Sequence, residues 1–185
     1  GLNLRQLLQM TPLPLAERLR IMRDVAAAVA AAHRAGVLHL DLKPENVMLD
    51  QQRRVKLIDL GMGWLLPRKQ TADRHIMGTL AYMAPEQWLG RTDAWGSHTD
   101  VFGLGALLYF LLTGRPPLDQ EKRLRTEHEL EEMLQESIRQ LQHVEGIGQL
   151  AQVCGRALQP NPLARFPNVE EFTLALRRCQ STGKY

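Results

Sequence analysis

Residues 39–46 read His39-Leu40-Asp41-Leu42-Lys43-Pro44-Glu45-Asn46 and form one polar loop. An acid, a cation and an amide lie close together in it, at Asp41, Lys43 and Asn46. Phosphoryl transfer can use all three, because a carboxylate can accept a hydroxyl proton, an ammonium can offset phosphate charge and an amide oxygen can bind magnesium. A polar turn between two strands is the alternative interpretation, since Asp and Asn favour turns.

A second acidic position, Asp59, follows the short apolar run Val55 to Ile58 and precedes Gly61. A carboxylate at a strand end can bind a hard cation, although Asp-x-Gly by itself is most often a turn. The runs 47–49 and 55–58 predict two short strands that form a hairpin through Asp50 to Arg54. We expect this hairpin to bring the Asp59 carboxylate beside Asn46.

The pattern around these residues predicts a mainly α fold with a small β-hairpin region. Val37 to Leu40 is a third short apolar run, which we interpret as a strand. Gly61 to Pro85 has no sustained period and is expected to be a long loop. Helical spacing, stop signals or amphipathic patterns predict helices at Leu15–Arg34, Asp100–Thr113, Glu127–Leu141, Ile147–Leu158 and Val169–Cys179.

The composition is that of one globular domain and excludes several functional classes. The chain has 185 residues, is 44% hydrophobic, and carries a net charge of +3 from 23 basic and 20 acidic residues that are interspersed. No basic run indicates nucleic-acid binding, and no apolar stretch is long enough to be a membrane segment. Cys154 and Cys179 lack metal-ligand spacing, so we expect free thiols and a cytoplasmic location.

Three motifs in order resemble those of protein kinases. The 39–46 stretch, Asp59-Leu60-Gly61 and Ala84-Pro85-Glu86 are similar in order and spacing to the catalytic loop, the magnesium motif and the end of the activation segment (59–86) of that family. Asp100 with Phe102-Gly103 resembles the start of the family's buried central helix. The chain thus resembles a eukaryotic-type (Hanks-type) serine/threonine kinase, in a bacterial-like version. The resemblance implies one partial kinase domain over residues 1–185, a C-terminal lobe with a helical remainder at 100–180.

The resemblance implies a role for each matching residue. Asp41 is expected to be the catalytic base and Lys43 the lysine that contacts phosphate, while Asn46 and Asp59 are expected to bind Mg²⁺ and so help to bind ATP. Met48 is expected to form the floor under the adenine, and Thr79 to contact Asp41 and Lys43. The implied substrates are Ser and Thr hydroxyls of proteins.

Four further residues are assigned by the resemblance without a catalytic role. Glu86 and Arg165 are expected to form a structural ion pair. Leu40 stands where regulated kinases carry an arginine that binds an activation-loop phosphate, so this mode of activation is doubtful. Leu60 replaces the usual phenylalanine, a change that keeps apolar bulk.

The N-terminal lobe of the family has no counterpart in this sequence. No Gly-x-Gly-x-x-Gly precedes a strand, no Val-Ala-Ile-Lys occurs, and the chain begins at Gly1 without Met, as a cut polypeptide would. We therefore expect these 185 residues alone to be inactive, and the exposed face of the lobe to favour dimerisation. The parent protein would be the enzyme. A pseudokinase or scaffold that binds a partner without phosphoryl transfer is the alternative.

Overall fold

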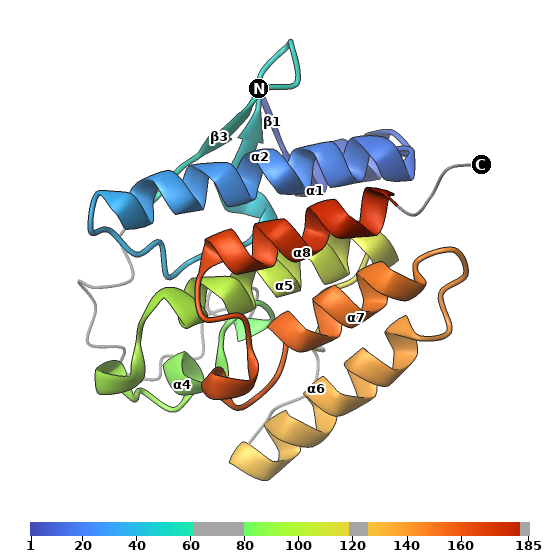
Figure 1. The fold of residues 1–185 in the computed structure, drawn as a ribbon. Helices are drawn as coiled ribbons and strands as arrows, with labels where there is room; N and C mark the ends of the chain where they lie inside the picture. The colour runs from blue at the N-terminus through green and yellow to red at the C-terminus, as the bar shows by residue number, and fades with distance from the viewer. Residues whose placement is uncertain (61–79, 119–125, 182–185) are drawn as a thin grey trace.

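The computed structural model describes residues 1–60, 80–118 and 126–181. These residues are mostly helical, with a small sheet at one end of the molecule (Figure 1). Strands β1 (Leu2–Asn3), β2 (Val47–Leu49) and β3 (Val55–Leu57) form an antiparallel sheet in the order β1-β2-β3. The predicted fold class, mainly α with a small β-hairpin region, is confirmed for the described residues.

Seven helices are described in the three ranges above, together with short 3₁₀ turns at Pro44–Asn46, Thr92–Ala94 and Pro162–Ala164. The helices are α1 (Leu4–Met10), α2 (Leu15–Arg34), α4 (Pro85–Trp88), α5 (Ser97–Thr113), α6 (Glu127–Leu141), α7 (Gly148–Ala157) and α8 (Val169–Ser181). The predictions for α2 and α6 are confirmed to the residue, and those for α5, α7 and α8 to within three residues at each end.

Helix α5 forms the centre of the molecule. Every residue from Thr99 to Leu112 is buried, and the helix packs against α2, α7 and α8. It ends at Gly114, whose φ of 75° lies in the left-handed region that glycine adopts freely, and whose N–H donates to the Phe110 carbonyl. Figure 1 shows α2 crossing between the sheet and α8, so α2 links the hairpin to the helical core.

The hairpin of β2 and β3 forms where the sequence predicts it. Val47 pairs with Leu57 and Leu49 with Val55. The turn is stabilised by Asp50, whose Oδ1 accepts hydrogen bonds of 2.9 Å from the backbone N–H groups of residues 52 and 54. The register continues by one more bond, from Ile58 N–H to the Asn46 carbonyl, so the chain after β3 runs beside the polar loop.

The structure corrects one predicted strand and adds three elements, one of which is the short helix α4 (Pro85–Trp88). Residues 37–40 do not form a strand, because the N–H groups of His39 and Leu40 donate to a side chain and Leu40 has a left-handed φ of 61°. Strand β1 and helix α1 were not predicted. An Asn3 capping box with Gln6 starts α1 directly after a two-residue strand, too short to give an alternating pattern. Of the predicted long loop, residues 61–79 lie outside the described residues.

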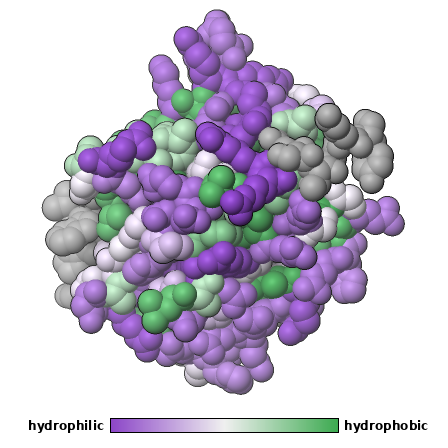
Figure 2. Space-filling model, viewed as in Figure 1, coloured by the Kyte–Doolittle hydropathy of each residue, from purple (hydrophilic) through white to green (hydrophobic). Residues whose placement is uncertain are grey.

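The surface and the cysteines agree with the composition. The face shown in Figure 2 is mostly polar, with separate apolar spots between polar side chains. Cys154 is buried and Cys179 half-buried, and both are free thiols. Burial raises the pKa of the Cys154 thiol, which therefore stays protonated at neutral pH. Within the described ranges, no helix combines the length and apolarity that a membrane span requires.

Candidate functional site

The polar loop brings three of the predicted site residues together. The Asp41 carboxylate lies 2.8 Å from the Lys43 ammonium and 3.0 Å from the side-chain nitrogen of Asn46, which also donates to the Asp41 backbone carbonyl at 2.8 Å. Asp41 and Lys43 remain partly exposed, whereas Asn46 is buried. Two donors therefore hold an accessible carboxylate in one orientation.

The loop is attached to α5 through its backbone. Asp100, in the first turn of α5 and 1% exposed, accepts from His39 N–H and Leu40 N–H at 2.7 Å each. A buried carboxylate needs several donors to offset its lost hydration. Asp100 finds them in the loop directly before Asp41, so the catalytic candidate is fixed to the most buried helix of the molecule.

A third donor reaches Asp100 from α2. His33 Nε2 lies 2.7 Å from Asp100 Oδ2, and His33 Nδ1 lies 3.0 Å from the hydroxyl of Ser97. His33 thus connects the end of α2 to the start of α5.

His39 is fully buried behind the loop. Burial lowers the pKa of its imidazole, although the Asp100 and Asp41 carboxylates act in the opposite direction. Its Nδ1 accepts from Asp41 N–H at 3.3 Å, which assigns the proton of the neutral ring to Nε2. His39 therefore supports the loop from inside and does not face the solvent, as a structural role requires.

The hairpin brings the backbone of the segment before Asp59 beside Asn46. Ile58 N–H donates to the Asn46 carbonyl, so Ile58 lies opposite Asn46. Asp59 is the next residue along the chain. Asp59 is exposed and has a φ of 60°. The bonds to Asp41 use the nitrogen end of the Asn46 amide, so its oxygen end is the one that would bind a cation. An amide oxygen and an exposed carboxylate are hard ligands that fit Mg²⁺, which takes its remaining positions from water and phosphate.

Two further predicted residues are Met48, which the structure describes, and Thr79, which lies outside the described residues. Met48 lies in the central strand, between the buried Val47 and Leu49, and is itself half-buried. Alternation along a strand points it away from the core side of the sheet, which leaves it free to contact a ligand on that face. Thr79, predicted to contact Asp41 and Lys43, lies outside the described residues.

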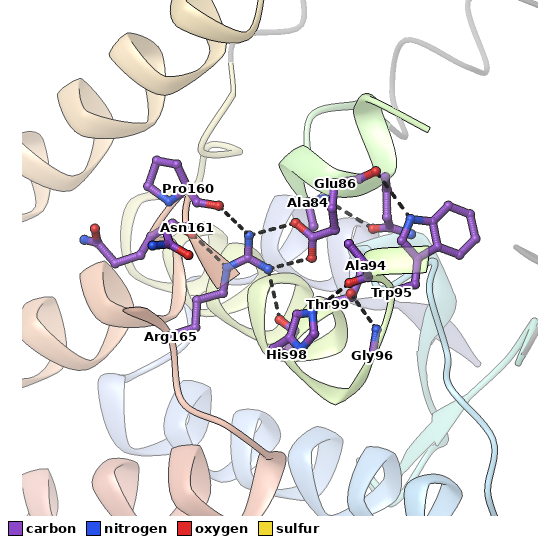
Figure 3. A network of polar contacts seen from close by, with 12 residues as sticks. Ala84, Glu86, Ala94, Trp95, Gly96, His98, Thr99, Pro160, Asn161 and Arg165 are labelled. Atoms are coloured by element: carbon purple, nitrogen blue, oxygen red, sulfur yellow. Dashed lines mark hydrogen bonds and ion pairs between the residues drawn. The ribbon is translucent and has the colours of Figure 1, made fainter. Parts of the chain in front are cut away.

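The predicted ion pair between Glu86 and Arg165 is confirmed, and Figure 3 shows the two side chains facing each other. Arg165 donates to both Glu86 carboxylate oxygens at 2.8 Å, and to the backbone carbonyls of His98, Gln159 and Pro160. The five N–H groups of the guanidinium thus all have acceptors. This pair, almost completely buried, ties α4 to the loop before α8.

Comparison with known proteins gives the family. The model of the protein kinase domain matches residues 2–170, which is most of the chain. The chain belongs to the protein kinase family. The resemblance inferred from residues 39–46, 59–61 and 84–86 is thereby confirmed.

Curated relatives of the chain are bacterial serine/threonine kinases. The chain is similar to serine/threonine-protein kinase PknB of Mycobacterium leprae, with 32% identity over 175 residues, 92% of this chain and 27% of the relative. It is also similar to PknD of Mycobacterium tuberculosis, with 34% identity over 192 residues, 100% of this chain and 28% of the relative. PknL of the same species shares 39% over 127 residues, 67% of this chain and 31% of the relative. The chain thus spans less than a third of the length of these relatives.

Three contacts around this candidate site were not predicted. Asp100 was identified only as the start of a helix; its signal is a carboxylate beside a long apolar run, which predicts a buried charge with partners. Gln87, directly after the 84–86 motif, donates from Nε2 to the Leu40 carbonyl at 2.8 Å. Arg5 of α1 pairs with Glu45 and donates to the Tyr82 hydroxyl. The last two join distant segments, and no local pattern identifies such pairs.

Proposed function

We propose that the parent protein is a serine/threonine protein kinase that uses Mg²⁺ and ATP, and that this chain forms its C-terminal lobe. The observation that carries the proposal is the Asp41 carboxylate held between Lys43 and Asn46, on a loop fixed to α5 by Asp100. Phosphoryl transfer depends mainly on positioning and electrostatics, and this loop supplies both.

In this proposal the substrate hydroxyl oxygen attacks the γ-phosphorus of ATP. A bond forms between that oxygen and phosphorus, the bond from phosphorus to the bridging oxygen breaks, and ADP leaves with its electron pair. Asp41 orients the hydroxyl and accepts its proton, and Lys43 offsets the charge on the transferred phosphoryl group. Asp41 can do so because it is partly exposed and its orientation is fixed by Lys43 and Asn46.

Asn46 and Asp59 are the residues that would hold Mg²⁺. When bound, the cation supplies neutralisation of phosphate charge. The chain contributes the orientation of the two ligands: the hydrogen bonds of Asn46 to Asp41 fix its amide, and the hairpin brings Asp59 alongside. Met48, on the sheet face away from the core, is proposed to contact the adenine.

We propose that these 185 residues do not transfer phosphate alone. The sequence contains no glycine-rich loop and no strand lysine for the ATP phosphates, and such contacts account for much of the positioning in kinases.

We also propose that the rest of the domain covers the sheet side, where Leu2, Ile58 and Leu60 are exposed. With that side uncovered, the chain alone is expected to dimerise through it. Sedimentation of the isolated chain tests this, and a single monomeric species would contradict it.

We propose a cytoplasmic site of action for this part of the protein, because its two cysteines are free thiols, as is usual in a reducing compartment. Its partners would be proteins with Ser or Thr acceptors.

The test of the proposed function is transfer of the ATP γ-phosphate to a protein substrate by the full-length parent. We expect Mg²⁺-dependent labelling of Ser or Thr. A folded parent that neither binds ATP nor transfers phosphate would refute the proposal and favour a pseudokinase, in which the lobe binds a partner only.

A further inference from the structure

Leu40 is held by hydrogen bonds at both its backbone N–H and its backbone carbonyl. Its φ of 61° lies in the left-handed region, which a leucine rarely adopts. Its N–H donates to Asp100 Oδ1 at 2.7 Å, and its carbonyl accepts from Gln87 Nε2 at 2.8 Å. The Leu40 side chain is 6% exposed and apolar, so these two backbone bonds are its polar attachments. The Leu40 carbonyl belongs to the peptide group directly before Asp41, whose orientation helps to set the direction of the Asp41 side chain.

Gln87 is itself oriented at its other end. Its Oε1 accepts from the backbone N–H of Ala84 at 3.2 Å, just before the start of α4. The two bonds use opposite ends of one amide, which fixes the amide in the orientation that points the donor at Leu40. The preceding residue, Glu86, is anchored by Arg165. Gln87 therefore connects the 84–86 segment, which Arg165 holds in place, to the loop that carries Asp41.

We propose that Gln87 is a positioning residue for Asp41, through its bond to the Leu40 carbonyl. This inference rests on the proposed function, because it assigns Gln87 a part in phosphoryl transfer. The side chain of Leu40 is apolar and offers no polar link to the 84–86 segment. The side-chain amide of Gln87 supplies that link from the other direction, through the backbone.

The surroundings of Leu40 indicate that its bond with Gln87 matters more for the position of the loop than for the stability of the fold. A small hollow borders the Leu40 peptide and is lined in part by Asp41, Gln87, Thr99 and Asp100. Water entering from this hollow can bond to the Leu40 carbonyl when the amide is removed, so the carbonyl need not stay unsatisfied. The main consequence of removing the amide is a less restrained orientation of the loop before Asp41.

Two substitutions in the full-length parent test this inference. Gln87→Glu keeps an acceptor for Ala84 N–H and replaces only the donor to Leu40 by a second oxygen. Gln87→Met keeps the length of the side chain and removes both bonds. We expect each to lower kcat at least about tenfold while KM for ATP changes less than about twofold, since positioning errors reduce the chemical step. Gln159→Met is the matched control, because that half-buried amide also donates to a backbone carbonyl, that of Gly155, and we expect its kcat to stay at the wild-type value.

A second measurement on the same proteins separates this inference from the proposed function. Hydrogen exchange of the Leu40 and Asp41 amides, compared with amides within α5, reports the restraint on the loop without any activity. Faster exchange at the loop alone in both Gln87 variants supports the inference. Wild-type exchange and wild-type kcat in either variant would overturn it. If the wild-type parent transfers no phosphate, the proposed function fails, and the exchange result still decides whether Gln87 positions the loop.

Discussion

At the scale of single residues, the site depends on groups that are costly to bury or to strain. Leu40 has a backbone conformation that costs a leucine about 1–2 kcal/mol. Asp100 is an almost fully buried carboxylate whose donors are supplied by His33 and by the loop. Such features persist only where the surrounding structure enforces them. Here they lie directly beside the residue proposed to accept the substrate proton.

His39 makes stability depend on pH. Burial lowers the pKa of its imidazole in the folded chain below the ordinary value of 6.5, so between the two pKa values the unfolded state binds more protons. The free energy of unfolding therefore falls as the pH drops through about 6.5, and levels off below the folded-state pKa. Urea unfolding of the wild type and of His39→Asn from about pH 8 to about pH 5 measures this contribution.

Carboxylates titrate in both proteins, so the difference between them isolates His39. We expect the stability advantage of the wild type over His39→Asn to shrink towards acid pH. A difference that stays constant over the range would contradict the assignment of a buried, neutral His39.

At the scale of elements, two glycines of α5 allow the 39–46 loop and helix α7 to pack close to its backbone. A methyl group on Gly103 would lie 2.8 Å from Cβ of Leu42 in the catalytic loop, and one on Gly105 would lie 2.7 Å from Cβ of Ala157 in α7. Both contacts are closer than real Cβ atoms come, so either substitution requires a movement of the neighbour. The two glycines therefore separate an effect on the catalytic loop from an effect on helix packing.

We expect Gly103→Ala and Gly105→Ala each to lower the free energy of unfolding by about 1–3 kcal/mol, as overpacking of a core does. Only Gly103→Ala should also lower the kcat proposed for the full-length parent, because it displaces Leu42 next to Asp41. Gly148→Ala, where a methyl group meets nothing within 4 Å, is the control for both. Equal kcat values in the Gly103 and Gly105 variants would show that the contact with Leu42 does not control the loop.

The ion pair between Glu86 and Arg165 connects α4 to the loop before α8. Arg165→Met leaves a buried Glu86 carboxylate unpaired and removes one donor from each of three backbone carbonyls. We expect a loss of about 3–5 kcal/mol in the free energy of unfolding. Adding Glu86→Gln should recover about 1 kcal/mol or more, because it removes the unpaired charge. Strictly additive losses in the double variant, measured by urea unfolding, would mean that the two side chains do not interact in solution.

The sequence allowed the helical elements and the β2–β3 hairpin to be predicted because each has a local signal. The apolar spacing of α2 and α6, Gly114 after α5 and the turn residues around Asp50 are examples. It did not allow β1, α1, α4 or the true state of residues 37–40 to be predicted. These depend on partners far along the chain: β1 pairs with β2, and the N–H groups of the loop donate to Asp100.

In the candidate site, too, the residues that lie close in the sequence could be predicted and the tertiary contacts could not. Asp41, Lys43 and Asn46 lie within one loop, so their spacing alone brings them together, and the hairpin extends this to Asp59. The restraints on the loop come from α2, α4 and α5 through His33, Gln87 and Asp100. A single sequence does not contain that tertiary information, because residues 47 to 67 positions apart carry no mutual pattern.

At the scale of the whole molecule, the described residues form a helical body with α5 at its centre and a small sheet at one end (Figure 1). The polar loop of residues 39–46 lies between the sheet and α5. Asn46, in the turn before β2, connects the loop to the sheet, and the bond from Leu40 N–H to Asp100 connects it to α5. This position puts Asp41 next to the side on which Met48 and Asp59 would meet ATP. The body thus presents the acceptor end of the proposed reaction.

The most direct test is the rate of γ-phosphate transfer by the full-length parent, compared with its Asp41→Asn variant. Asn keeps the size and the acceptor oxygen of Asp41 and cannot take the substrate proton. We predict Mg²⁺-dependent transfer by the wild type, and a kcat lowered about 10²–10⁴-fold in the variant with unchanged folding. Equal rates in the two proteins would contradict the role of Asp41, and with it the central claim that this loop carries the chemistry.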